Sequence, residues 1–424
     1  MGAALKPVFA LLFAGSIFLV GNGLQTSLVP LSAELHGINK PVIGLIGALY
    51  FVGFGAGCLV GPSLLQRVGH VKVYGAMTAL GGGAMAFYVL SADPALWAVL
   101  RMITGFAFAI LYMVIESWLN EIATNDNRGT IFSTYTFLNL TVVTAGQSMI
   151  VLADPTAPTL FAINAGLVTF AALPLLLSNT AQPSMIEINP VRMKLLFQKS
   201  PAGVMGGVAV GLGNGAFWSL APNFGLGIGL DVNGIASFMA LGVLAGALGQ
   251  VPLGRLSDKL DRRLVIMGAS ISAMFACAFM GMIAVPGTTI MAGMVWFGLF
   301  AFPVYGLCVA HVNDRVAPGQ FVGAASAMLL LYAVGAVAGP IIAAFVMEWM
   351  GASALFLYIG GVYGILVLLI LVRVGVRSRV EEEDREDFVA VPRPSPAAAM
   401  LDPRGADGDS EEVDLPIIGQ SEEH

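Results

Sequence analysis

The sequence predicts an all-α membrane protein with twelve transmembrane helices in two six-helix halves and both termini in the cytoplasm. Three observations predict this fold: an apolar composition, a regular series of long apolar segments, and an internal repeat at a constant offset. Such a chain has lipid as its solvent, where helices satisfy their own backbone hydrogen bonds.

The composition excludes a soluble globular protein. Of the 424 residues, 57% are hydrophobic and 11% are charged, and the mean hydropathy is +0.84. Soluble domains have about 25% charged residues, whereas one bilayer crossing needs about 20 apolar residues. Because the first apolar window is long and no A-x-A site follows it, we expect an uncleaved helix there. The twelve windows are 8–30, 41–61, 72–91, 96–118, 130–152, 159–178, 203–224, 233–253, 264–285, 288–311, 321–345 and 352–373.

Lysine and arginine predict the orientation. If the N-terminus is cytoplasmic, fifteen basic residues lie on the inner side and only Lys40 lies in an outer loop. This positive-inside bias predicts a multi-pass protein of the cytoplasmic (inner) membrane with both termini inside. The inner residues are Lys6, Arg67, Lys72, Arg128, Arg192, Lys194, Lys199, Arg255, Lys259, Arg262, Arg263, Arg315, Arg373, Arg377 and Arg379.

The C-terminal segment 376–424 differs from the rest. It holds 14 acidic and 5 basic residues, a net charge of −9. So polar a segment buries too little apolar surface to offset its ordering entropy, which predicts a disordered cytoplasmic tail. A docking or regulatory tail is the alternative interpretation.

The two halves share residues at a constant offset. GNGLQTSLVP at 21–30 returns as GNGAFWSLAP at 213–222, which is 192 positions later. A tandem repeat with six crossings per unit gives parallel halves, a symmetry of secondary transporters whose substrate site lies between the repeats. We therefore expect a first half at 1–178, a central cytoplasmic loop at 179–202, a second half at 203–375 and the tail. Further matched pairs, at an offset of 193, are Gly105 and Gly298, Asn120 and Asn313, and Glu121 and Asp314.

The loop after the eighth predicted helix carries the most specific motif, GRLSDKLDRR at 254–263. It resembles the loop signature G-x-L-x-D-R/K-x-G-R-R of the major facilitator superfamily. The matching residues are Gly254, Leu256, Asp258, Lys259, Arg262 and Arg263, and Asp261 stands where the second glycine is expected. The resemblance extends over roughly residues 5–375 and implies a secondary transporter that works by rocking of its two halves.

In the first-half copy of this loop, PSLLQRVGHV, Arg67 and Gly69 match the signature, whereas Pro62, Gln66 and Val71 depart from it and His70 replaces an arginine. We expect the second-half loop to act as a conformational switch, with Asp258 accepting hydrogen bonds at a neighbouring helix N-terminus. Positive-inside anchoring is the alternative, and we favour it for the first half because Gln66 cannot supply an anion. Glu116 is expected to meet a basic loop residue such as Arg67 or Arg128 in an inner gate, or else to be a solvated helix end.

A narrower resemblance lies in IESWLNEIATNDNRG at 115–129. It is similar to the uncharacterised YcaD-like branch of the superfamily, which implies no assigned substrate. The Gly-Pro pair of drug antiporters in the fifth helix is absent, and TAGQSM stands in its place.

Arg101 is the only cation inside a predicted helix. A charge at the bilayer centre costs about 2.5–3.5 kcal/mol on insertion scales, so it usually faces protein or a watery cavity. We expect Arg101 to bind an anionic or polar group or to couple to protons; the alternative is snorkelling to the interface. It also matches the superfamily's helix-four arginine. Arg101, Gly105, Phe108, Tyr112 and Glu116 share one helical stripe.

Polar and aromatic residues of other helices complete the predicted cavity. Asn22 and Gln25 share a face of the first helix, and Asn214 and Trp218 share the equivalent face of the seventh. Amides and a tryptophan suit an uncharged part of a substrate, whereas hydrogen bonding between helices is the alternative. Further candidates are Asn139, Gln147, Tyr305 and Tyr332.

These residues predict a secondary active transporter of a small organic solute, acting as a monomer in the bilayer. Since no carboxylate lies in the middle of a predicted helix, a proton co-substrate and facilitated diffusion are both open. The sequence shows no catalytic set, no cofactor or metal motif and no nucleic-acid patch, so we expect no enzyme, no cofactor and no nucleic-acid partner. A receptor or scaffold that signals through its acidic tail is the alternative. Substrate and direction of transport do not follow from the sequence.

Overall fold

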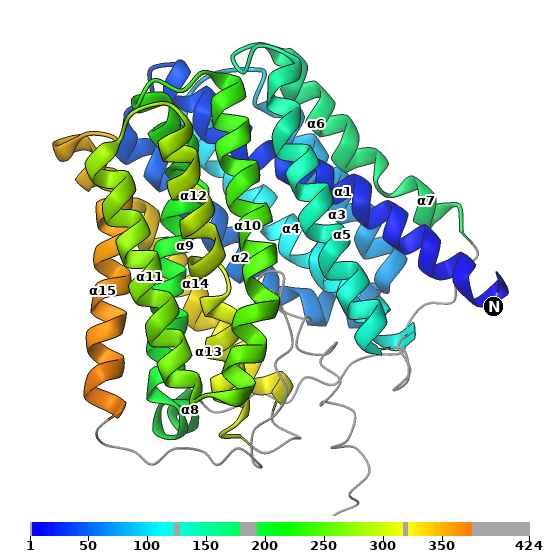
Figure 1. Cartoon of the computed structure of the whole chain (residues 1–424). Helices are drawn as coiled ribbons and strands as arrows, with labels where there is room; N and C mark the ends of the chain where they lie inside the picture. Colours follow the sequence, from blue (N-terminus) through cyan, green and yellow to red (C-terminus); the bar gives the residue numbers. More distant parts are fainter. Residues whose placement is uncertain (1, 123–127, 179–192, 317–320, 375–424) are drawn as a thin grey trace, which may run out of the picture.

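Long helices make up the computed structural model, which describes residues 2–122, 128–178, 193–316 and 321–374 (Figure 1). The described part of the chain contains no strand. The first-half helices are α1 (Gly2–Leu35), α2 (Lys40–Val68), α3 (His70–Phe87), α4 (Pro94–Ile122), α5 (Arg128–Ser148), the 3-10 helix η1 (Met149–Leu152), α6 (Pro158–Phe170) and α7 (Leu173–Leu176). After α8 (Met193–Lys199), the second half comprises α9 (Pro201–Gly227), α10 (Val232–Lys259), α11 (Arg262–Ile283), α12 (Thr288–Ala301), α13 (Val304–Asn313), α14 (Phe321–Met350) and α15 (Ala354–Val374).

The apolar windows of the sequence coincide with these helices. Eleven helical segments within the described ranges are long and apolar enough to cross a membrane. The predicted third crossing, 72–91, coincides with α3, which is helical but is not one of these eleven. The predicted tail 376–424 and most of the central loop lie outside the described residues, although α8 shows that the loop ends in a short helix.

Turns and caps explain where the second helix of each half begins. Gly37 and Gly229 adopt φ of +80° and +90°, a conformation that glycine takes without steric cost. Two residues later, Asn39 accepts a hydrogen bond from the Val42 amide and Asp231 accepts one from the Gly234 amide. Such side-chain caps satisfy amides that have no partner in the first helical turn. Each turn residue and each cap returns 192 positions later, so the repeat extends to local structure.

Close helix crossings repeat in the same way. At each crossing an added glycine Cβ would clash with the main chain of the facing helix, so the helices approach more closely than other residues allow. The crossing of α1 with α5 uses residues equivalent to those in the crossing of α9 with α14. The crossing of α2 with α4 is likewise equivalent to that of α10 with α12. The equivalent contacts are Gly23–Val143 and Gly215–Ala336, Gly146–Val20 and Gly339–Leu212, Gly105–Tyr50 and Gly298–Gly242, and Gly57–Phe106 and Gly249–Leu299. Every equivalent residue is 192 or 193 positions further on.

One predicted crossing, 288–311, is interrupted. Pro303 lacks an amide hydrogen and cannot donate to the Leu299 carbonyl, so α12 ends at Ala301 and α13 begins at Val304. The break lies beside the centre of the molecule and turns Phe302 and Tyr305 toward α9 and α14, whose Trp218 and Tyr332 they contact.

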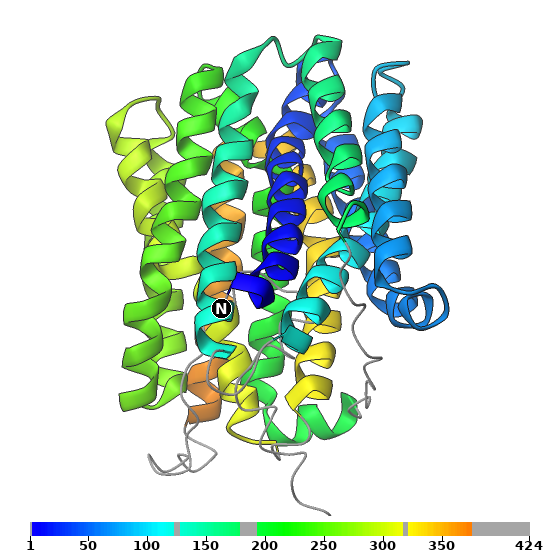
Figure 2. The ribbon, with the colours of Figure 1, turned by 90° about the vertical axis from the view of Figure 1, so that its right-hand side faces the viewer.

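The helices of the two halves converge at one end. Figure 1 shows α5 beside α10 near the upper end and leaning away from it toward the lower end, and Figure 2 shows the same pair side by side. α2 also packs against α14, where Gly44 faces Pro340 and Ala344. The halves are therefore joined through α2–α14 and α5–α10.

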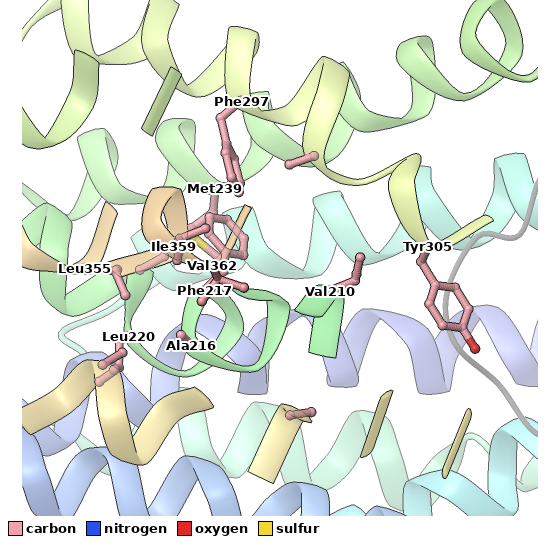
Figure 3. Close-up of a cluster of buried hydrophobic side chains, with 14 of the residues drawn as sticks. Val210, Ala216, Phe217, Leu220, Met239, Phe297, Tyr305, Leu355, Ile359 and Val362 are labelled. Carbon is pink, nitrogen blue, oxygen red and sulfur yellow. The ribbon is translucent and has the colours of Figure 1, made fainter. Parts of the chain in front are cut away.

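A buried apolar cluster supports the second-half side of the centre (Figure 3). Phe217 of α9 lies among Met239, Phe297 and Ile359, and its ring centroid is 5.6 Å from that of Phe297. Phe217 also contacts Trp218 edge to face at 5.0 Å. The cluster thus holds the part of α9 that carries Trp218.

Replacing Gly215 by valine is expected to lower the thermal unfolding midpoint of the purified protein. The side chain would overlap the Ala336 main chain, and overpacking of this kind costs about 1–3 kcal/mol. The matched control is Gly361→Val in α15, where a Cβ meets nothing within 4 Å. Equal midpoints for the two variants, measured in the same detergent, would contradict the close crossing of α9 and α14.

Candidate functional site

A cavity lies between the two halves and takes wall residues from both. The empty space among its wall residues is about 1170 Å³, open solvent included. The polar wall residues are Asn22, Thr26, Arg101 and Asn139 from the first half and Asn214, Ser219 and Gln250 from the second. The aromatic wall residues are Tyr50, Phe51, Phe54, Trp218, Phe302, Tyr305 and Tyr332.

Arg101 supplies the positive charge of this wall. Its guanidinium carbon lies 4.4 Å from the centroid of the Tyr50 ring, and the residue is 5% exposed. Its Nη1 is buried and has no hydrogen-bond partner in the described residues. A cation–π contact contributes about 0.5–2 kcal/mol, whereas burying an ion costs several kcal/mol. Tyr50 therefore offsets only part of the cost of burying the charge.

The second half supplies a flat aromatic surface. The rings of Trp218 and Phe302 stack with centroids 5.7 Å apart and an interplanar angle of 8°. Tyr305 and Tyr332 meet edge to face at 5.3 Å. Because Phe302 follows the end of α12 and Tyr305 belongs to α13, the interruption of this crossing builds part of the surface.

The amide side chains predicted for the cavity divide into two groups. Asn22, Asn139 and Asn214 lie on the wall, and Asn22 Nδ2 donates to the Tyr112 hydroxyl at 2.9 Å. Tyr112 and Gln25 were expected on the wall but are not among the residues that line it, and both side chains are buried. Tyr112 lies one turn further along α4 than Phe108, and its hydroxyl holds the Asn22 side chain through this hydrogen bond. Their roles in binding stay predictions.

At the end of the second half where α10 meets α11, Arg262 is the centre of a charged cluster. Its Nε donates to Asp314 Oδ2 at 2.7 Å and its Nη1 donates to Ser257 Oγ at 3.0 Å. Asp258, one turn earlier on α10, lies 3.3 Å from the same guanidinium. The side chains of Arg262 and Asp314 are 1% and 2% exposed, so this ion pair is sheltered from water.

Asp261, which stands at the expected glycine position, caps α11. Its Oδ1 accepts a hydrogen bond from the Arg263 amide, and the guanidinium of Arg263 lies 2.7 Å from its Oδ2. Desolvation alone would raise the pKa of Asp261, but hydrogen bonds from Arg263 outweigh it and lower the pKa. Asp261 is thus the N-cap of α11, whereas Asp258 belongs to the last turn of α10, and its expected role at a neighbouring helix N-terminus stays a prediction. Gly254 and Lys259 lie on the same final stretch of α10.

The corresponding end of the first half, where α2 meets α3, differs from this charged cluster. Gly69 has φ of +90° between α2 and α3, and Arg67 is exposed. His70, at the position of Arg262, has its Nε2 3.1 Å from Ser117 Oγ. Glu116 is buried and accepts a hydrogen bond from the Tyr135 hydroxyl at 3.1 Å. The inner gate stays a prediction, since the Arg128 side chain lies outside the described residues.

The opposite end of the cavity is closed by a hydrogen-bonded network. Asn223 of α9 is fully buried, and its Nδ2 donates to the Pro30 carbonyl at 2.8 Å and to Glu34 Oε2 at 2.6 Å, both on α1. Glu34 Oε1 in turn lies 3.4 Å from Lys40 Nζ. The two hydrogen bonds from Asn223 join the two halves at the Lys40 end.

The family model described as Major Facilitator Superfamily matches residues 11–199 and 203–404. The chain belongs to the major facilitator superfamily. Relatives of this superfamily member include the uncharacterised MFS-type transporter YcaD of Escherichia coli, 26% identical over 88% of this chain and 98% of the relative. An uncharacterised MFS-type transporter of Enterobacter sp. is 27% identical over 87% and 96% of the two chains. The chain is accordingly a multi-pass membrane transporter and not an enzyme.

Solved structures share the fold of this superfamily member. The nucleoside transporter NupG matches with a TM-score of 0.73 at 13% identity, over 88% of this chain and 100% of that one. A bacterial homologue of the human lysosomal transporter Spinster, in an inward-facing and unoccupied conformation, matches with a TM-score of 0.67 at 14% identity, over 87% and 95%.

Several wall residues were not identified from the sequence. Tyr50 and Phe302 contact Arg101 and Trp218, but nothing distinguishes them from the many other aromatic residues of apolar segments. Gln250 could have been found, because it is the one amide side chain in its apolar window, 233–253, apart from Asn233 at the first position. Asn223 has no counterpart in the repeat, where Leu31 stands.

Removing Asp314 is expected to destabilise the protein more than neutralising Asp258. Asp314→Ala breaks a pair in which Arg262 is 1% exposed, and breaking a buried pair costs about 3–5 kcal/mol. Asp258 is 26% exposed, so Asp258→Asn is expected to cost much less stability and to act on the conformational equilibrium. Thermal unfolding of both variants in detergent tests the ranking, and a larger loss for Asp258→Asn would contradict it.

Proposed function

We propose that this protein is a secondary transporter that carries a small organic solute across the cytoplasmic membrane by alternating access. The observation that carries the proposal is the central cavity, walled by both halves and closed at the Lys40 end by the Asn223 network. One chain completes this cavity, which supports a monomer as the working unit.

Twelve crossings with both termini inside belong to the same proposal. α3 packs between α4 and α6. If α2 and α4 both cross the membrane in the same direction, the chain between them has to cross back, and α3 is then the twelfth crossing. The bias of basic residues toward one side supports a cytoplasmic N-terminus. In that orientation the Lys40 end is external, so the described conformation is closed outside and faces inward.

The neighbouring structures do not identify the substrate. One transports nucleosides and another, with a TM-score of 0.54 and 15% identity, is a fucose:proton symporter. At such identities the likeness supports the shared fold and the rocking mechanism alone. The scaffold alternative is disfavoured, because a scaffold needs no cavity that extends across both halves.

Alternating access predicts that a cavity cysteine reacts with a membrane-impermeant maleimide from either side. Ala247→Cys, made after Cys58, Cys277 and Cys308 are replaced, lies on the cavity wall. We expect fast labelling in inverted vesicles and slower labelling in intact cells. Adding Asn223→Ala is expected to raise the external rate severalfold, because it removes the two hydrogen bonds that close the outer end.

The matched control for this experiment is Asn164→Ala. Asn164 also donates from a buried amide to a main-chain carbonyl, that of Gly21, but within the first half. Its removal is therefore expected to leave the external rate unchanged. Labelling from the cytoplasmic side only, in every variant, would refute alternating access and favour the scaffold.

Proton coupling is the finer part of the proposal, and Glu116 supports it. Within the described wall of the cavity no carboxylate occurs, and Glu116 is buried one turn deeper than Tyr112 with Tyr135 as a partner. A buried carboxylate that takes up a proton in one conformation would tie protonation to the movement of the halves.

If Glu116 is the proton site, the external labelling rate of Ala247→Cys will change between mildly alkaline and mildly acidic buffer. The rate is first divided by that of Ala92→Cys, an exposed loop position, to remove the intrinsic pH dependence of the thiol. Glu116→Gln is expected to abolish the remaining pH response. An unaltered response in Glu116→Gln would exclude this residue and leave facilitated diffusion or another proton site.

A further inference from the structure

Arg101 carries a charge that the described protein does not neutralise. No carboxylate forms an ion pair with it in the described ranges, and its buried Nη1 has no hydrogen-bond partner there. The remaining described wall residues are uncharged. The cavity thus presents one unpaired cation to whatever occupies it.

A purely structural role does not explain this arrangement. Tyr50 contacts the guanidinium through its ring face, which supplies no hydrogen-bond acceptor to the buried Nη1 of Arg101. A structural arginine at this fold's other buried site, Arg262, has a carboxylate and a hydroxyl as acceptors instead. The Tyr50 ring holds the Arg101 cation in position while its buried Nη1 has no acceptor in the described residues, which is the arrangement of a binding group.

The rest of the wall indicates what is attached to the anionic group. The parallel pair of Trp218 and Phe302 offers a flat apolar surface, and a flat ring stacks on such a surface. The amides of Asn139, Asn214 and Gln250 provide donors and acceptors without charge. A single cation matches one negative charge, since a second would be buried without compensation.

From these observations we propose that the transported solute is an organic monoanion, a carboxylate attached to a flat apolar body. The carboxylate binds Arg101 of the first half, and the apolar body stacks on Trp218 of the second half. This inference rests on the proposed function, since it names the substrate class of the same cavity. A ligand held this way contacts both halves, so its binding favours their approach.

Binding to the purified full-length protein tests the substrate class without requiring transport. The probes are three matched pairs: benzoate and benzamide, phenylacetate and phenylacetamide, and indole-3-acetate and indole-3-acetamide. Tryptamine is the cationic counterpart of the last pair, and sodium chloride is the inorganic anion. We expect the carboxylates to raise the thermal unfolding midpoint and to bind more tightly than their amides, and tryptamine and chloride to have little effect.

Two substitutions assign the effect to Arg101. Arg101→Gln is expected to weaken carboxylate binding by about tenfold to a hundredfold, the loss typical of a charge-assisted hydrogen bond, and to leave amide binding unchanged. Arg255→Gln, the same change at an exposed position of α10, is the matched control and is expected to have no effect. If Arg101→Gln does not fold, Arg101→Lys, which keeps the charge and loses the fork of donors, is expected to retain weaker carboxylate binding.

Several results would overturn the proposal. These are equal affinities for acid and amide members of every pair, tighter binding of tryptamine, no midpoint shift with any carboxylate, or carboxylate affinity unchanged by Arg101→Gln. A midpoint shift with chloride as large as that with the carboxylates would show that the ligand does not need a flat apolar body. Carboxylate binding without labelling of Ala247→Cys from outside would instead reject alternating access and keep the site, so the two failures are distinguishable.

Discussion

Backbone-to-backbone contact at glycine crossings is the constraint on which the rest of this structure depends. In lipid, apolar side chains gain little by leaving their solvent, so helices associate mainly through close packing. Here α1 packs on α5 and α2 on α4 through glycines, and α9–α14 and α10–α12 repeat the arrangement. Each half is thereby a rigid unit with its own tight contacts. The interface between the halves can then remain partly open, and this opening is the cavity.

Charge in this molecule lies where the fold can compensate for it, with one exception. Arg262 reaches the carboxylate of Asp314, and Asp261 is held by Arg263 at the start of α11. Both groups lie near helix ends, where water and neighbouring loops help to compensate for the charge. Arg101 lies in the cavity wall with the aromatic ring of Tyr50 against its guanidinium. Within the described residues, the fold pairs its other buried arginines with carboxylates but not Arg101, as expected if Arg101 has the proposed binding role and the others have a structural one.

The sequence predicts the scaffold more fully than the site, for a physical reason. Apolar length and the repeat at 21–30 and 213–222 depend on local properties, and they locate the helices and the glycine crossings. The wall also depends on how helices rotate and break. Gln25 shares a helical face with Asn22 yet is buried away from the wall, and the Tyr112 hydroxyl accepts a hydrogen bond from Asn22. Phe302 enters the wall because Pro303 interrupts its helix, which no periodicity reveals.

The repeat also shows which parts of the molecule diverged. Glycine crossings and helix caps recur at 192 or 193 positions, whereas wall residues at the same offsets differ: Arg101 corresponds to Met294, Tyr50 to Gly242, and Trp218 to Thr26. The first half therefore holds the cation and its ring, and the second half holds the stacking surface. Symmetric packing allows the halves to rock about a common axis. In the proposed mechanism, an asymmetric wall makes one ligand contact both halves through different chemistry, so that recognition of the solute and movement of the halves depend on the same contacts.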